Sequence, residues 1–390
     1  MSHLFRASLE TAQSPSRPKP TPIAVTPLDF DDQSSSDSSA SSADSFASIN
    51  TIRPSSAEPP APPSHWTNYY AQELFLSQDN DDQRARYHVY ITPPSDPKKG
   101  PLFICHHGAG VTGLSFAVFA RHIRKRLPHA GVLSLEARAH GSTVTGSKSG
   151  EAIVDFSLET LAADALSMIS LTQQKMGWST LPPVVLIGHS LGGAITTRIA
   201  ASPPPHLLTA LVGNCVVDVV EGSAVEALGH MRTYLSSRPS KFPTTDAAIQ
   251  WHLHSRTIRS KESAEASVPA LLRSTMPGEF QTSYTWLTDL QATSPWWPDW
   301  FTNMSTSFLA GRCAKLLILA GTDRLDKTLM IGQMQGKFQL VVLPEAGHFV
   351  QEDVPERMAG LLADFFTRND RSQMVLPPKV ADLIAQGKKV

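Results

Sequence analysis

Apolar runs and helical patterns alternate along most of the chain after residue 64. Ser157 is a plausible N-cap for one helical pattern, and Pro355 suits the first turn of another. The alternation predicts an α/β fold with a mostly parallel sheet covered by helices. The strands are predicted at 86–92, 101–108, 131–136, 183–189, 211–218, 315–321 and 338–345, and the two helices at 156–175 and 355–366.

Two regions depart from this alternation. Residues 222–310 are helix-like, rich in Trp and Arg, and lack a strong strand, which predicts a helical cap inserted over the ends of the sheet. The N-terminal region is dominated by Ser, Pro, Asp and Ala and has too little apolar area to order itself. The predicted organisation is a disordered tail (1–63), the first part of the core (64–221), the cap (222–310), the second part of the core (311–369) and a C-terminal extension (370–390).

Composition narrows the class of partner. The 41% hydrophobic and 18% charged residues are typical of a soluble globular protein. A formal net charge of -1 gives no global field toward nucleic acid or an anionic membrane. No apolar stretch reaches the ~18–20 residues that a membrane span needs. We therefore expect neither nucleic acid nor membrane as a partner.

The cysteines and the N-terminus bear on the compartment. Cys105, Cys215 and Cys313 show neither a CxxC pair nor metal-ligand spacing, which favours a reducing environment, small buried side chains and no metal site. The N-terminus lacks the apolar core of a signal peptide. We expect a cytoplasmic or nuclear protein. A mitochondrial presequence in the mildly amphipathic opening is the alternative, and the acidic residues that follow weaken it.

The motif that carries chemistry is Gly188-His189-Ser190-Leu191-Gly192. An apolar strand precedes it and helix-forming residues follow it. This is the strand–turn–helix of a nucleophile elbow, which raises a serine hydroxyl above the sheet of an α/β-hydrolase. The two glycines avoid a collision across the tight turn. We predict Ser190 as the nucleophile of a serine hydrolase.

A serine hydroxyl needs a general base at neutral pH. His348 follows the last predicted strand, the usual position of the α/β-hydrolase histidine, and the order Ser before His fits. His189 is adjacent to Ser190 and is expected to point elsewhere. His106 and His107 precede the nucleophile's strand, and we expect them to shape a loop.

The oxyanion of acyl transfer needs two backbone donors. One is predicted to be the amide of Leu191, directly after the nucleophile. The second is predicted in the His107–Gly110 loop, at Ala109. The acid that orients His348 stays open on spacing alone, because Asp218 and Asp323 both follow apolar strands that end at the same edge of the sheet.

Several longer blocks resemble eukaryotic protein phosphatase methylesterases: LIGHSLGGAI, VVDVVEGSAVEAL, YTWLTDL, LLILAGTDRLDK, IGQMQGKFQ and LPEAGHFVQED. The resemblance covers roughly residues 64 to 368, and the DVVEG and GQMQGKFQ blocks are far more specific than GxSxG. It implies an α/β-hydrolase that removes the methyl ester from the C-terminal leucine of the protein phosphatase 2A catalytic subunit. It also implies that the chain binds this phosphatase as a regulator and needs no cofactor.

The resemblance also implies site residues. It assigns the acid to the Asp of the DVVEG block, Asp218, and it carries the nucleophile and base over to Ser190 and His348. The HHGAG turn departs from the more uniformly glycine-rich turn of animal relatives. Two other functions are compatible with the motifs: a general carboxylesterase or lipase for small esters, and a non-catalytic regulator that binds the phosphatase.

Overall fold

The computed structural model describes residues 65–275, 283–321 and 325–370. The chain divides into two units, Met1–Pro59 and Pro60–Val390, and every described residue belongs to the second. The predicted tail (1–63) and the C-terminal extension beyond residue 370 lie outside the described residues. The same is true of Asp323, the alternative acid.

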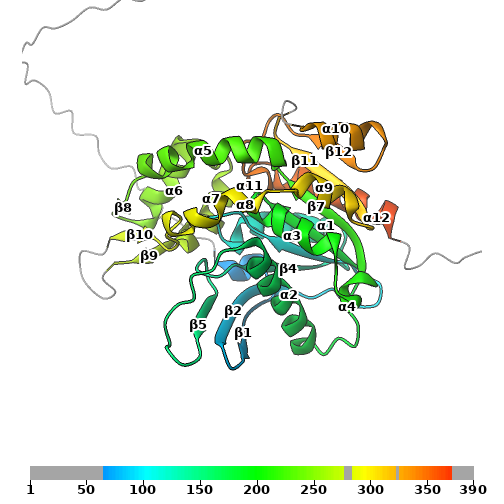
Figure 1. Cartoon of the computed structure of the whole chain (residues 1–390), viewed down its shortest axis with the longest axis horizontal. Helices are drawn as coiled ribbons and strands as arrows, with labels where there is room; N and C mark the ends of the chain where they lie inside the picture. Colours follow the sequence, from blue (N-terminus) through cyan, green and yellow to red (C-terminus); the bar gives the residue numbers. More distant parts are fainter. Residues whose placement is uncertain (1–64, 276–282, 322–324, 371–390) are drawn as a thin grey trace, which may run out of the picture. The chain divides into compact units, whose positions relative to one another are not determined.

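The described part of the chain is built on a nine-stranded sheet with the order β1-β2-β4-β3-β6-β7-β11-β12, and β5 pairs with β2 (Figure 1). Every pair from β4 to β12 is parallel, whereas the pairs made by β2 with β1, β4 and β5 are antiparallel. The prediction of a mostly parallel sheet is therefore confirmed. The strands are Gln72–Asp79 (β1), Gln83–Thr92 (β2), Leu102–His106 (β3), Gly131–Glu136 (β4), Thr143–Gly146 (β5), Val184–His189 (β6), Leu211–Val217 (β7), Ala314–Leu319 (β11) and Gln339–Val342 (β12).

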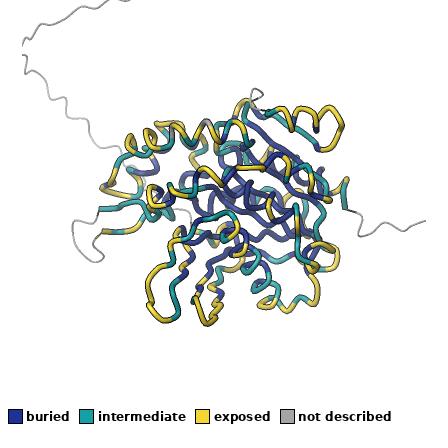
Figure 2. Tube along the Cα trace, in the orientation of Figure 1, coloured by how far each residue is buried: buried dark blue, intermediate teal, exposed yellow. Residues whose placement is uncertain are grey.

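Helices cover both faces of the sheet, as the continuous apolar runs predict. Along β6, Leu186 packs on the face covered by α2, α3 and α9, and Ile187 packs on the face covered by α1 and α12. Successive strand residues point to opposite faces, so both must be apolar. Figure 2 shows these central strands as buried.

The helices on the two faces include both that the sequence predicts. Ser157 caps α2, where its hydroxyl accepts a hydrogen bond from the Thr160 amide, and Pro355 begins α12. In the described residues, no helix is long and apolar enough to span a bilayer. The helices of the core are Ala117–Arg126 (α1), Leu158–Lys175 (α2), Leu191–Ala201 (α3), Pro205–Leu208 (α4), Lys327–Met334 (α10), Val350–Asp353 (α11) and Pro355–Asn369 (α12), with 3-10 turns at Trp66–Asn68 (η1) and Gly113–Phe116 (η2).

The interval 222–310, predicted as a helical cap, contains helices and also a small antiparallel sheet ordered β8-β10-β9, which the sequence did not predict. These strands have two or three residues each, too short for a periodic signal. The boundaries of the cap stay a prediction. The elements here are Glu221–Ser237 (α5), Lys241–Phe242 (β8), Thr245–His254 (α6), Lys261–Ser267 (α7), Val268–Leu271 (η3), Leu272–Ser274 (β9), Tyr284–Trp286 (β10), Gln291–Trp296 (η4), Trp297–Trp300 (α8) and Met304–Ala310 (α9).

Candidate active site

Ser190 occupies the turn that joins β6 to α3. Its backbone has φ 51° and ψ −121°, a conformation that is strained for a residue with a side chain. A Cβ on Gly188 would lie 2.1 Å from the carbonyl oxygen of Gly192, and a Cβ on Gly192 would lie 2.2 Å from that of His106. Both obstacles are backbone atoms, so only glycine fits at either position. The GxSxG motif therefore forms a tight turn that exposes Ser190 to the adjoining cavity.

A carboxylate holds the ring of His348. The His348 Nδ1 atom lies 2.8 Å from Asp218 Oδ2, and the second carboxylate oxygen of Asp218 accepts a hydrogen bond from the Ala320 amide at 2.8 Å. Because a carboxylate only accepts, Nδ1 carries the proton and Nε2 is left to accept one. Burial alone would raise the pKa of Asp218, but the hydrogen bond and charge of His348 lower it below its ordinary value.

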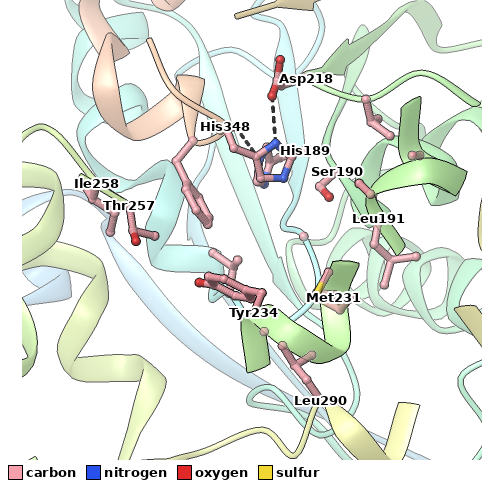
Figure 3. A pocket seen from close by; sticks show the side chains of 18 of the residues that line it. His189, Ser190, Leu191, Asp218, Met231, Tyr234, Thr257, Ile258, Leu290 and His348 are labelled. Carbon is pink, nitrogen blue, oxygen red and sulfur yellow. Dashed lines mark hydrogen bonds and ion pairs between the residues drawn. The ribbon is translucent and has the colours of Figure 1, made fainter. Parts of the chain in front are cut away.

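Ser190 and His348 line the same cavity, whose volume is about 450 Å³, and Asp218 lies behind the imidazole (Figure 3). Within the described residues there is no hydrogen bond between the Ser190 hydroxyl and the His348 ring. Such bonds are often long in hydrolases without substrate and tighten in the Michaelis complex. The structure thus brings the predicted nucleophile, base and acid to one cavity wall.

Of the two candidate acids that the sequence left open, Asp218 lies among the described residues and Asp323 does not. Asp218 follows β7, and Asp323 lies four residues beyond the end of β11. β7 and β11 are parallel neighbours, so the carboxyl ends of both strands reach the same edge of the sheet. Among the described residues, Asp218 is the carboxylate bonded to His348. Asp323 lies outside them.

Two backbone amides are available for an oxyanion. Leu191 is the first residue of α3, and Ala109 belongs to the loop after β3; both line the cavity. In the described structure neither amide has an intramolecular acceptor. The first amides of a helix point along its axis and favour developing negative charge. The assignment of these two donors stays a prediction.

Buried histidines hold the loop that carries Ala109. The His107 Nδ1 donates to the Gly108 carbonyl at 2.7 Å, so this histidine shapes the loop as predicted. His140, which no sequence motif predicts, accepts a hydrogen bond from the Gly110 amide at its Nε2, at 2.8 Å. Burial lowers the pKa of His140 to about 4, so this nitrogen keeps its lone pair at neutral pH.

His189 has a larger role than its place beside Ser190 indicated. Its Nε2 donates to the backbone carbonyl of His348 at 2.9 Å, and the two ring centroids lie 4.7 Å apart. Burial lowers the pKa of His189 to about 3, which keeps the ring neutral beside the base. His189 therefore positions the backbone of His348. Nothing in the local sequence signals this contact, because its two partners are 159 positions apart in the chain.

The remaining walls of the cavity come from the cap. One face of α5 lines it, together with Trp286 and Trp300. Trp300 is 2% exposed, and its indole donates to the Phe156 carbonyl, so it packs as a core residue. Arg238 and Glu352 also line the cavity. Neither residue could be predicted from the sequence, since only the packing of α5 and α11 around the cavity distinguishes them from other charged residues.

Comparison with known proteins identifies the family of the chain. The model of the "Alpha/beta hydrolase family" matches residues 103–361. A protein named protein phosphatase methylesterase 1 from Aspergillus fumigatus is 54% identical over 82% of this chain and 76% of its own length. Proteins of the same name from Neurospora crassa and Schizosaccharomyces pombe are 48% and 43% identical, over 91% and 81% of this chain and 88% of their own lengths.

Solved structures agree on the fold. E-2-(acetamidomethylene)succinate hydrolase superposes with a TM-score of 0.54 at 18% identity, over 75% of this chain and 100% of that one. A thioesterase domain from the curacin biosynthetic pathway has a TM-score of 0.51, also at 18% identity, over 75% of this chain and 99% of that one. The predicted α/β-hydrolase fold is therefore confirmed. The chain belongs to the protein phosphatase methylesterase family of α/β-hydrolases and is a carboxylic ester hydrolase.

Proposed function

We propose that this chain removes the methyl ester from the C-terminal leucine of the protein phosphatase 2A catalytic subunit. Ser190 is the proposed nucleophile, His348 the general base and Asp218 the orienting acid. The observation that carries the proposal is the 2.8 Å hydrogen bond between His348 and Asp218 at the wall of the cavity that Ser190 also lines. The names of the relatives indicate a methyl ester on a protein phosphatase, and the family resemblance of the sequence blocks implies the C-terminal leucine of protein phosphatase 2A.

In the first half-reaction, His348 Nε2 takes the hydroxyl proton of Ser190 while the serine oxygen attacks the ester carbonyl carbon. The negative charge moves to the carbonyl oxygen, where the Leu191 and Ala109 amides stabilise it. The tetrahedral intermediate then collapses and its C–O bond to the methoxy group breaks. The imidazolium returns its proton to that oxygen, so methanol leaves and an acyl-serine remains.

In the second half-reaction, water attacks the acyl-serine and gives a proton to the same imidazole. The second tetrahedral intermediate releases the serine oxygen, which regains the proton, and the free carboxylic acid ionises in water. The net change is one ester plus one water to one carboxylate, one proton and one methanol. Asp218 keeps His348 in the tautomer that accepts at Nε2 in both halves.

The cavity suits a peptide end better than a bare small ester. Its volume of about 450 Å³ exceeds what a methyl ester needs, and its walls are mostly apolar, as a leucine side chain requires. An ester is a chemically undemanding acyl substrate, so selection must come from the contacts with the rest of the peptide. We propose the cytoplasm or nucleus as the compartment, since all three cysteines are free thiols.

The test compares methyl-esterified phosphatase with a nitrophenyl ester as substrates of the purified chain. We expect methanol release from the phosphatase with a higher kcat/KM than for the small ester, and none from Ser190→Ala. A general carboxylesterase would favour the small ester. A non-catalytic regulator would bind the phosphatase and release no methanol, so either result would refute the proposal.

A further inference from the structure

Arg238 is a positive charge on the cavity wall without an anionic partner in the described part of the chain. It follows the last residue of α5, and its guanidinium carbon lies 4.3 Å from the ring centroid of Trp286 and 5.8 Å from that of Tyr234. Its Nε is buried and has no hydrogen-bond partner. Burial lowers the pKa of Arg238, which indicates that the charge is held away from water at a cost.

The other charged groups of the cavity do not balance Arg238. Among the described residues that line it, Asp218 and Glu352 are the acids. Asp218 is bonded to His348. Glu352 is 1% exposed and accepts a hydrogen bond from Ser267, and burial raises its pKa to about 8, so it is mainly neutral at pH 7. Arg256, also on the wall, adds a second positive charge.

Structural contacts explain only part of this placement. Arg238 lies at the C-terminus of α5, where the helix dipole favours a cation. Its stacking on Trp286 is a favourable cation–π contact. Neither contact supplies a full negative charge. A guanidinium has five N–H donors in a planar fork that matches a carboxylate. A carboxylate on a ligand would supply the anionic partner that Arg238 lacks in the described part of the chain.

The cavity runs from the catalytic residues to Arg238 along one face of α5. Ser223, Ala227, Met231, Tyr234 and Arg238 line it at helical spacing. At about 1.5 Å per residue, the 15 steps from Ser223 to Arg238 span roughly 22 Å. Figure 3 shows Met231 and Tyr234 across the cavity from Ser190. An extended peptide advances about 3.3 Å per residue, so roughly seven residues cover this length.

We propose that Arg238 binds an acidic side chain of the esterified peptide, within about seven residues on the N-terminal side of the ester. The substrate class of the site is then a C-terminal methyl ester on an acidic tail. This inference rests on the proposed function, because it needs a peptide ester bound with its carbonyl at Ser190. It assigns to Arg238 a specificity role distinct from the chemistry.

The test uses synthetic peptides that end in leucine methyl ester. One Asp is placed at each position from two to seven residues before the ester, and each peptide is paired with its Asn counterpart. The readout is the ratio of kcat/KM for the Asp peptide to that for the Asn peptide with the same enzyme preparation. This ratio does not depend on how much of a variant is folded, so a purely structural role of Arg238 leaves it unchanged.

We expect a ratio of roughly 10 to 100 for at least one position in the wild type, the size of a charge-assisted hydrogen bond. Arg238→Met should bring that ratio to about one, and Arg238→Lys should leave an intermediate value because it keeps the charge without the fork. Arg232→Met is the matched control. Arg232 is exposed on the same helix away from the cavity, so its loss should leave the ratio as in the wild type.

The outcomes separate this inference from the proposed function. Ser190-dependent hydrolysis of the methyl-ester peptides with a ratio near one at every position would overturn the role of Arg238 and leave the methylesterase proposal intact. An unchanged preference in Arg238→Met would do the same. If a nitrophenyl ester is hydrolysed but neither the peptides nor the methylated phosphatase are, both proposals fail.

Discussion

Replacing Asp218 by Asn tests the orientation of the catalytic base with almost no change of shape. The Ala320 amide donates to one oxygen of Asp218, and His348 Nδ1 donates to the other. In the variant, the Ala320 amide should keep its hydrogen bond to the carboxamide oxygen, and this bond turns the NH2 group toward His348. His348 must then accept at Nδ1 and carry its proton on Nε2, the tautomer that cannot take the proton of Ser190.

The expected loss follows from this change of tautomer. In the serine protease triad, the same exchange lowers kcat about 10⁴-fold with the geometry intact, so we expect a loss of 10³- to 10⁴-fold in kcat, about 4 to 5.5 kcal/mol. The assay is methanol release from a methyl-esterified peptide, with thermal unfolding to verify that the melting temperature stays close to that of the wild type. KM should change little, because Asp218 acts through its hydrogen bond to His348.

Asp323→Asn is the matched control, because Asp323 follows the neighbouring strand β11. We expect it to retain activity within tenfold of the wild type. A loss below tenfold for Asp218→Asn in a folded protein would rule out Asp218 as the residue that sets the tautomer of His348. A larger loss for Asp323→Asn than for Asp218→Asn would reassign the acid.

The remaining predictions concern stability. Gly192→Ala should cost at least about 2 kcal/mol of unfolding free energy, because its new Cβ would collide with backbone atoms. Gly229→Ala is the matched control: it lies on an exposed turn of α5 with no atom within 4 Å of its Cβ, so it should be neutral or gain up to about 1 kcal/mol. Urea unfolding compares the two variants. Asp164→Ala should cost about 3–5 kcal/mol of unfolding free energy, because it leaves the buried Arg138 without its ion-pair partner. Arg138→Met combined with Asp164→Leu should recover most of this loss. Equal melting temperatures for the single and double variants would contradict this prediction. Burial raises the pKa of Glu352 from 4.5 to about 8, so its contribution to stability is full below about pH 4.5 and is lost as the pH rises through 8. Relative to the wild type, Glu352→Gln should therefore become more stable by a few kcal/mol between about pH 5 and pH 8.5, and a difference that stays constant with pH would contradict it.

The sequence predicts the sheet strands where burial on both faces makes them continuous apolar runs, as at β3, β4 and β6. It does not predict β1 or β5. β1 lies at the edge of the sheet and most of its residues are polar and exposed, so its pairing with β2 defines it more than its own pattern does. Tertiary pairing likewise defines the three short strands of the interval 222–310.

Local motifs predict site residues only when the chemistry is local in the chain. Ser190 and its glycines lie within five residues, and the turn follows from their order. The choice between Asp218 and Asp323 could not follow from spacing, because parallel neighbouring strands carry both. The roles of His189, His140 and Arg238 depend on contacts across the fold, for which the residue type alone carries no signal.

Covalent labelling identifies the nucleophile of the chain without any assumption about its substrate. A fluorophosphonate probe should modify the purified chain once, and peptide mapping should place the label on Ser190. A methyl-esterified phosphatase tail should slow the labelling by competition. A label on any other residue, or demethylation at the wild-type rate by Ser190→Ala, would rule out Ser190 as the nucleophile.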